Sequence, residues 1–232
     1  MNKKPLVSFI IRTKNESLLI GKVLETLQIQ TIRDFEVLII DSGSSDNTLD
    51  IVKKYPVRIL KIKQSNFTYG YALNYGIRKS LGKYICIISG HSLPIFDNFL
   101  ESGIKILQEP NVAGVSGPCP DFAVGYLNRF FGRIILLFER KRSDYSPWMT
   151  NTNSIIKREM WEMYNFDESL SGCEDYDWGK EMIFRGYNIV KTRLFSVFHS
   201  HWVLGRPGYF RMQKVWYEWN KIVDSKSRPS KN

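Results

Sequence analysis

The stretch from Phe35 to Asp46, FEVLIIDSGSSD, most constrains what this chain can fold into. Its apolar run from Val37 to Ile40 is long enough for a strand buried on both faces and too short for a helix. The run ends at Asp41, and small polar residues follow before a helical pattern begins at Thr48. A buried strand that delivers a carboxylate to its C-terminal end is how open α/β sheets present ligand-binding groups.

The same succession of strand and helix recurs along the first half of the chain. Strands are predicted at 7–11, 37–40, 57–62, 84–88 and 112–115, and helices at 19–27, 48–55, 69–80 and 96–108. This alternation predicts an α/β fold with a mostly parallel central sheet and helices on both faces. Beyond Pro118 the rhythm changes, with short strands at 154–157 and 195–198 and helices at 174–185 and 209–223. Neither a linker nor an internal repeat interrupts the pattern, so we expect a single domain over residues 1–224 and a frayed basic tail over 225–232.

The composition is that of a globular protein, with 43% hydrophobic and 24% charged residues among 232. Three cysteines, Cys86, Cys119 and Cys173, show no CxxC spacing, which suits packing residues in a reducing cytoplasm. The apolar run near the N-terminus is too short for a signal peptide, and no window approaches the roughly 20 apolar residues that span a bilayer. We therefore expect a cytoplasmic protein.

The net charge of +10 favours anionic partners, which are nucleic acids, phosphorylated small molecules and acidic membrane surfaces. The basic residues are scattered, and no zinc-finger, RNP or basic-zipper pattern is present, so nucleic acid is set aside. The segment from Asn128 to Arg140 is apolar with arginines between, and Lys141 and Arg142 follow it. It fits a core-facing helix, which we favour, or an interfacial helix beside anionic lipid. The second alternative would place the protein peripherally on the inner face of the cell membrane.

Four segments with many polar residues end strands or begin helices: Thr13 to Glu16, Asp41 to Asp46, Ser89 to Ser92, and Gly172 to Asp177. In a parallel sheet the first three meet along one edge, because the carboxyl ends of its strands lie together. The sequence therefore predicts a ligand-binding cleft at that edge.

The set and order of these segments resemble the family 2 glycosyltransferases, which have the GT-A fold. The resemblance runs from about Val7 to His201 and is carried by VSFIIRTKNE, FEVLIIDSGSSDNTLDIVKKY, YGYALNYGIRKSLGKYICII, NTNSIIKREMW and FDESLSGCEDYDWGKEMIFRGY. It implies a GT-A domain with a nucleotide-sugar-binding half over about 1–118. An acceptor and catalytic half would cover 119–205, and a C-terminal helix 206–224.

The resemblance implies a nucleotide-binding role for four residues. Asp41 would accept a hydrogen bond from the base, although an Asp at this point also suits a simple turn. Thr13 and Glu16 resemble nucleotide-contacting residues, and Ser89 stands beside the diphosphate position. Lys14 replaces the aromatic residue that stacks on the base in many relatives, so the base is not identified. Gly70, Asn74 and Trp178 each allow a packing role as well as a ligand-binding one.

The metal motif departs most from the family pattern. Relatives usually carry two aspartates around one residue, whereas this chain has Ser89, Gly90 and His91. Some relatives bring a C-terminal histidine back to the metal, and His199 and His201 follow a late strand here. The sequence does not decide which of these two serves the site. Imidazole suits Mn²⁺ and other transition metals better than Mg²⁺, so a divalent metal, Mn²⁺ rather than Mg²⁺, is expected.

Three carboxylates fall within the four residues from Glu174 to Asp177, at the start of a predicted helix. The helix dipole favours acids there by about 0.3–1 kcal/mol, which accounts for one carboxylate but hardly for three. The resemblance makes Asp175 the catalytic base, and the helix N-terminus would keep it ionised. Glu174 would orient or bind the hydroxyls of the acceptor.

The function implied is an inverting glycosyltransferase that moves a sugar from a nucleotide-sugar donor to a glycan or glycolipid acceptor, in bacterial surface polysaccharide synthesis. A nucleotidyltransferase of related fold is an alternative, but it usually has a glycine-rich loop after its first strand, and RTKNE contains no glycine. A non-catalytic sugar-nucleotide-binding protein is a second alternative, motivated by the missing aspartate. The intact Glu174–Asp175 pair argues against it.

Overall fold

A computed structural model of the chain describes residues 3–120, 130, 133–134, 136–138, 142–143, 147–199, 201 and 209–228, with the backbone alone at 138, 142–143 and 209–213. Its strands are β1 (Val7–Thr13), β2 (Phe35–Asp41), β3 (Arg58–Lys61), β4 (Tyr84–Ser89), β5 (Ser92–Pro94), β6 (Val112–Ser116), β7 (Arg142–Ser143), β8 (Asn153–Lys157), β9 (Asn188–Thr192) and β10 (Val197–His199). Its α-helices are α1 (Ile20–Gln28), α2 (Thr48–Val52), α3 (Tyr69–Lys79), α4 (Phe99–Leu107), α6 (Arg158–Met163), α7 (Glu174–Phe184) and α8 (Tyr209–Ser225). Short 3₁₀ turns are η1 (Gln64–Asn66), η3 (Leu136–Phe138) and η4 (Arg193–Phe195).

The central sheet has the strand order β3-β2-β1-β4-β8-β6-β9-β7. The first four strands of this order, β3, β2, β1 and β4, are parallel to one another, and β6 is parallel to β9. Strand β8, which lies between β4 and β6, is antiparallel to both. The last strand, β7, is antiparallel to β9. A separate antiparallel pair, β5 and β10, lies outside this sheet. The mostly parallel sheet predicted from the sequence is confirmed.

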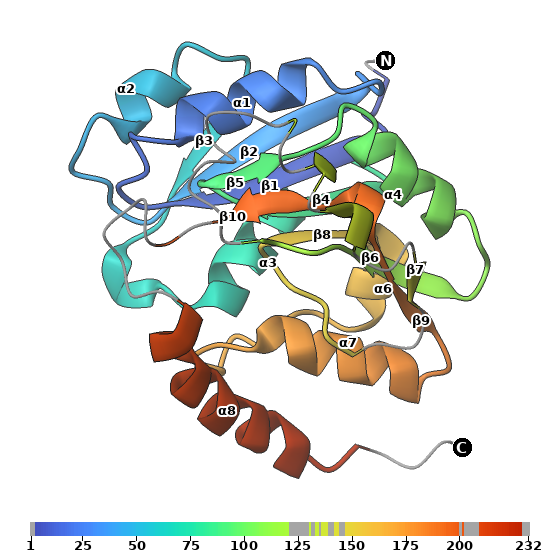
Figure 1. The fold of residues 1–232 in the computed structure, drawn as a ribbon. Helices are drawn as coiled ribbons and strands as arrows, with labels where there is room; N and C mark the ends of the chain where they lie inside the picture. Colours follow the sequence, from blue (N-terminus) through green and yellow to red (C-terminus); the bar gives the residue numbers. More distant parts are fainter. Residues whose placement is uncertain are drawn as a thin grey trace.

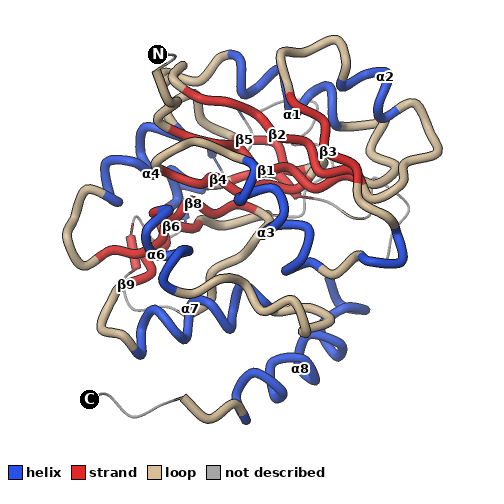
Figure 2. Tube along the Cα trace, turned by 180° about the vertical axis from the view of Figure 1, so that it is seen from behind, coloured by secondary structure: helices blue, strands red, loops and turns tan. Residues whose placement is uncertain are grey.

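Helices cover both faces of the sheet, because successive residues of each buried strand point to opposite faces. Phe9 and Ile11 of β1 pack in the core that α1, α2 and α4 complete. Ile10, between them, packs in the second core with α3, α6 and α7. Figure 1 shows α1 and α2 on one side of the sheet and α3, α7 and α8 on the other, and Figure 2 shows the same layers from behind.

Local side-chain contacts set where helices begin. The Asp46 carboxylate accepts a hydrogen bond from the Thr48 amide at 3.0 Å, at the start of α2. Burial would raise the pKa of Asp46, but hydrogen bonds from Thr48 and Ser17 outweigh it and lower the pKa to about 2. The Thr68 hydroxyl likewise accepts from the Tyr71 amide and caps α3.

The second half of the chain differs most from the sequence-based expectation. The strand predicted at 195–198 begins later, because Arg193–Phe195 forms a 3₁₀ turn capped by the Thr192 side chain. Helix α6 and strands β5, β7 and β9 were not predicted. Each is short, and short elements carry too few periods of the hydrophobic pattern to be recognised.

The end of the chain is more ordered than expected. The predicted final helix is present as α8, and the chain continues to Arg228 in a defined position. Lys226 and Arg228 form ion pairs with Asp177 of α7 at 3.1 and 3.2 Å. The prediction of a frayed tail was therefore wrong for these residues. Among the helices that the structure describes, none is both long enough and apolar enough to cross a membrane.

Candidate active site

The loops that follow β1 and β2 are fastened to each other by hydrogen bonds. The Asn15 side chain accepts from the Ser45 amide at 2.8 Å, and the Asn15 amide donates to the Ser44 hydroxyl at 3.0 Å. Asn15 has a φ of 54°, a left-handed conformation that asparagine tolerates better than most residues. The Glu16 amide donates to the Thr48 hydroxyl at 2.7 Å. These contacts build the predicted edge at the carboxyl ends of the strands.

Asp41 and Thr13 lie side by side at this edge, as partners in the β1–β2 register. Both are buried. The Asp41 carboxylate accepts hydrogen bonds from the amides of Gly43 and Ser44 at 3.1 and 3.2 Å, so it closes the turn. The turn role is thus present, and the contact of Asp41 with a base remains a prediction. The Thr13 hydroxyl has no hydrogen-bond partner among the described residues, which fits a group that a ligand satisfies.

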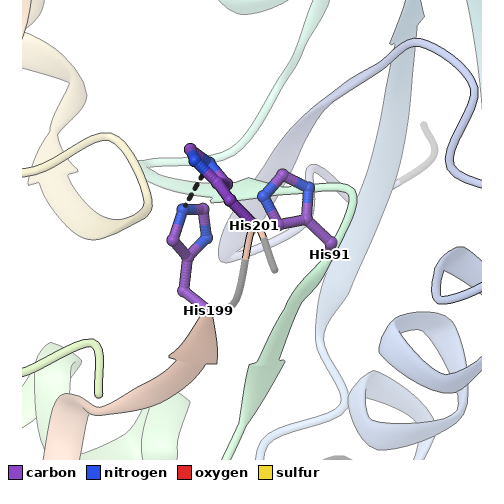
Figure 3. A group of neighbouring side chains, drawn as sticks. All are labelled: His91, His199 and His201. Carbon is purple, nitrogen blue, oxygen red and sulfur yellow. Dashed lines mark hydrogen bonds between the residues drawn. The ribbon is translucent and has the colours of Figure 1, made fainter. Parts of the chain in front are cut away.

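The three histidines of the chain converge on one point (Figure 3). Their potential ligand nitrogens all lie within 4.8 Å of one another. The rings of His91 and His199 are stacked with centroids 4.4 Å apart, and Nε2 of His199 lies 3.1 Å from Nε2 of His201. Both C-terminal histidines therefore reach His91. Their i, i+2 spacing at the end of a strand, which places side chains on one face, was a signal for this.

A second layer of polar side chains contacts the histidines from behind. Glu16 Oε1 lies 3.0 Å from His91 Nδ1, and both side chains are buried. Ser92 Oγ lies 3.1 Å from His199 Nδ1, because the two residues are opposite each other in the β5–β10 strand pair. A Cβ at Gly90 would come within 2.9 Å of Glu16, so only glycine lets this turn approach so closely. Glu16, predicted as a nucleotide contact, is in the structure a partner of His91.

The histidine cluster fits a divalent transition metal. Two imidazole nitrogens about 2.1 Å from one ion lie about 3.0 Å apart at a right angle and about 3.4 Å apart at a tetrahedral angle. The 3.1 Å between His199 and His201 falls in this range. A set of three nitrogen donors favours transition metals over Mg²⁺, which prefers oxygen ligands.

The two candidate catalytic carboxylates begin α7. Asp175 accepts hydrogen bonds from the backbone amides of Asn151 and Tyr176, both at 2.8 Å. Glu174 is buried and accepts from the Asn151 side-chain amide at 3.0 Å. Asn151 therefore holds both carboxylates. The Ser89 amide donates to the carbonyl of neighbouring Thr152 at 3.4 Å, which ties this loop to the end of β4.

The two carboxyls differ in how readily they ionise. Burial and the neighbouring charge of Asp175 raise the pKa of Glu174 to about 7. Burial also raises the pKa of Asp175, but the amides of Asn151 and Tyr176 oppose this effect. The amides that Asp175 accepts from favour its anionic form, and a pKa of about 7 leaves Glu174 partly protonated at neutral pH. The helix N-terminus does favour the charged form of Asp175, although burial works against it.

Sequence reasoning missed Arg12 as a residue of the site. It is the residue before the last of β1, beside Ser89 of β4, and its guanidinium lies over the Tyr69 ring, 4.8 Å from the centroid. Its positive charge lowers the pKa of both Glu174 and Asp175 against the effect of their burial. A charged residue close to the end of an otherwise apolar strand was the signal for it.

Three further positions are structural. Gly70 packs against the carbonyl of Asp167. The Asn74 amide donates to the Phe166 carbonyl at 2.8 Å and accepts from the Trp161 ring nitrogen at 2.9 Å. Trp178 is fully buried, so it is a core residue rather than a platform for sugar stacking.

Comparison with solved structures supports the GT-A fold. A mannosyltransferase from Pyrobaculum calidifontis, solved with GDP-Man and Mn²⁺, superposes with a TM-score of 0.72 at 21% identity, covering 98% of this chain and 67% of that one. TarS from S. aureus, solved with UDP-GlcNAc, gives a TM-score of 0.69 at 16% identity, over 95% of this chain and 65% of the other. At these identities the likeness concerns the fold alone.

Sequence comparison finds relatives in bacteria. A glycosyltransferase of uncharacterised specificity from Rickettsia typhi is 27% identical over 210 residues, which are 86% of this chain and 63% of the relative. A Campylobacter jejuni GalNAc(5)-diNAcBac-PP-undecaprenol beta-1,3-glucosyltransferase is 25% identical over 243 residues, covering 98% of this chain and 77% of that protein. For two further Rickettsia glycosyltransferases, the match spans only 30% and 33% of the relative's length.

The family comparison covers more than half of the chain. The model described as glycosyl transferase family 2 matches residues 8–162. This range contains Thr13, Asp41 and His91, while Glu174 and the two C-terminal histidines lie beyond it. The chain belongs to glycosyl transferase family 2.

Proposed function

We propose that this chain transfers a sugar from a nucleotide-sugar donor to the hydroxyl of a glycan or glycolipid acceptor, with inversion at the anomeric carbon. The observation that carries the proposal is the Glu174–Asp175 pair, held by Asn151 and tied to the same sheet edge as Asp41 and the histidines. The Campylobacter relative, whose name specifies an undecaprenol-linked glycan, supports a lipid-linked acceptor and a role in surface polysaccharide synthesis.

Asp175 acts as the general base in this proposal. Its carboxylate takes the proton of the acceptor hydroxyl while the hydroxyl oxygen attacks the anomeric carbon, and the bond to the nucleotide diphosphate breaks on the opposite face. A general base of this kind contributes about 10²–10⁴ in rate. Glu174, whose pKa near 7 keeps it largely protonated below that pH, donates a hydrogen bond to the acceptor and orients it. Arg12 supplies a fixed positive charge beside both groups.

The donor end of the site belongs to the first half of the chain. Thr13, Asp41 and Ser89 contact the nucleotide, and the unsatisfied Thr13 hydroxyl supports this role. His91, His199 and His201 would hold a divalent metal, which would supply positive charge to the leaving diphosphate. The Mn²⁺ in the Pyrobaculum mannosyltransferase supports a metal at this place, and the nitrogen donors favour Mn²⁺ over Mg²⁺.

The test is donor turnover by the purified chain. A panel of UDP- and GDP-sugars is incubated with Mn²⁺, with Mg²⁺ and with excess chelator, and free nucleotide is measured with and without candidate lipid-linked acceptors. We expect turnover with Mn²⁺ to exceed turnover with Mg²⁺, and His91→Ala to lose it while retaining its circular dichroism spectrum. Full activity in chelator and in His91→Ala would reject the metal. Tight binding of a nucleotide sugar without any turnover would favour the non-catalytic binding protein instead.

A further inference from the structure

We infer that Glu16 and Ser92 are positioning residues of a transition-metal site, holding His91 and His199 by Nδ1 so that their Nε2 atoms face a shared ion. This inference rests on the metal site of the proposed function, and it assigns Glu16 a role different from nucleotide contact. It stands on two side-chain contacts, of 3.0 Å at His91 and 3.1 Å at His199.

The first contact fixes the tautomer of His91. A carboxylate only accepts hydrogen bonds, so Glu16 Oε1 places the imidazole proton on Nδ1. The lone pair that can bind a metal is then on Nε2. The Glu16 and His91 side chains are 5% and 7% exposed, so little water competes for this contact. Metal-binding histidines almost always have such a carboxylate or carbonyl behind them, and it fixes the orientation of the ring.

The second contact orients His199 in the same sense. Ser92 and His199 are directly opposite each other in the β5–β10 ladder, which brings the hydroxyl to Nδ1. The ring then directs Nε2 toward Nε2 of His201, 3.1 Å away. Without a cation, one of these two nitrogens donates a hydrogen bond to the other. A bound ion would take the place of that proton and accept the lone pairs of both nitrogens.

The arrangement also sets the charge of the site. The three candidate ligands are imidazoles, and the Glu16 carboxylate lies behind His91. A nitrogen-rich shell of this kind favours transition metals such as Mn²⁺, Co²⁺ or Zn²⁺ over Mg²⁺. Glu16 contacts His91 at Nδ1 and so acts from behind the ring, on the side away from Nε2.

The experiment measures metal affinity by calorimetry with Mn²⁺, Co²⁺ and Zn²⁺ alone, and the affinity for UDP and GDP in the absence of metal. Glu16→Gln keeps the size of the side chain and removes its charge. We expect it to weaken metal binding 10- to 100-fold and to leave metal-free nucleotide affinity unchanged. The matched control is Glu36→Gln, because Glu36 is likewise a hydrogen-bonded carboxylate, accepting from the Ser8 hydroxyl, but lies at the opposite end of the strands. The control should bind metal like the wild type.

A second variant serves if Glu16→Gln does not fold. Ser92→Ala removes only the hydroxyl behind His199, and it should shift the visible absorption spectrum of the Co²⁺ complex and weaken Co²⁺ binding several-fold. Weakened nucleotide binding with unchanged metal affinity in Glu16→Gln would overturn the inference, as would a wild-type chain that binds none of the three metals. A wild-type chain that binds metal through these residues but turns over no donor would refute the proposed function and leave this inference standing.

Discussion

Opposing effects act on the ionisation of Asp175, and burial, which raises its pKa, is the largest of them. Burial favours its neutral form, while two backbone amides and the nearby guanidinium of Arg12 favour its charged form. Glu174, one residue away, accepts from the Asn151 side-chain amide, and burial and the charge of Asp175 raise its pKa to about 7. The two backbone amides that Asp175 accepts from suit it to the role of base proposed here.

The first prediction concerns the base. Asp175→Asn is nearly isosteric and preserves the fold, but its amide cannot take up a proton at neutral pH. Transfer should fall by about 10²–10⁴, while calorimetry with the nucleotide should give an affinity close to that of the wild type. Asp41→Asn is the matched comparison and should weaken nucleotide binding first. Near-normal turnover in Asp175→Asn would move the base to Glu174, since Asp177 is buried and paired with Arg228.

The second prediction concerns stability and pH. In the folded chain the pKa of Glu174 is about 7, against an ordinary value of 4.5. The folded state therefore binds more protons than the unfolded state between these values, so this stabilisation is complete below pH 4.5 and is lost as pH rises through 7. Between pH 5 and 8 the free energy of unfolding should fall less in Glu174→Gln than in the wild type. The difference between the two falls should be on the order of 1–3 kcal/mol. Urea titrations at several pH values measure it, and parallel pH profiles would contradict it.

At the scale of elements, α7 is held by the C-terminal part of the chain. The Asp177 side chain, 1% exposed, contacts Lys226 at 3.1 Å, Arg228 at 3.2 Å and the Tyr164 hydroxyl at 2.8 Å. Figure 1 shows α8 lying alongside α7, which carries the candidate catalytic pair at its start. The contacts made by α8 and the residues after it thus support the position of the candidate base.

The third prediction tests this support. Arg228→Ala leaves a buried carboxylate with one cation fewer, so we expect a loss of about 3 kcal/mol in the free energy of unfolding and a fall in transfer. The control is Lys53→Ala, which breaks the exposed Lys53–Asp50 pair and should cost less than about 0.5 kcal/mol. Chemical denaturation of both variants gives the comparison. Equal, small losses in the two would show that the end of the chain does not secure α7.

At the scale of the whole molecule, a chain of net positive charge exposes apolar side chains in the part of residues 130–137 that the structure describes. Phe130, Ile134 and Leu137 are 62%, 41% and 64% exposed. Leu136 is buried against Leu93 and Phe198. Among the described apolar side chains of this segment, Leu136 is thus buried and three face solvent, so the choice between a core-facing and an interfacial segment stays a prediction.

The fourth prediction is a salt-sensitive association with anionic lipid. A chain of net charge +10 that exposes these side chains should float with vesicles containing phosphatidylglycerol at low salt and be released at high salt. Leu137→Ser should weaken flotation. Leu81→Ser, at a site 52% exposed in the loop after α3, should not. Protein that stays in solution beside acidic vesicles would exclude this surface as a membrane contact.

What the sequence determined was the local order of the chain. The apolar runs predicted β1, β2 and β4, because a run of four or five apolar residues bounded by polar ones suits a buried strand and is too short for a helix. The rule that parallel strands present their carboxyl ends together then placed Thr13, Asp41 and Ser89 at one edge. The start of α7 was also predictable, since three acids in its first turn suit a helix N-terminus.

What only the tertiary structure decided were contacts between residues far apart in the chain. Glu16 contacts His91, 75 positions away in the chain. Ser92 contacts His199, 107 positions away, because β5 pairs with β10, and local sequence patterns do not predict this pairing. The antiparallel insertion of β8 between β4 and β6 and the pairing of Asp177 with Arg228 are of the same kind. Propensity and periodicity act over a few residues, whereas the partner of a buried charge or imidazole depends on which elements the fold packs around it. The roles of Glu16 and Arg12 followed from those neighbours.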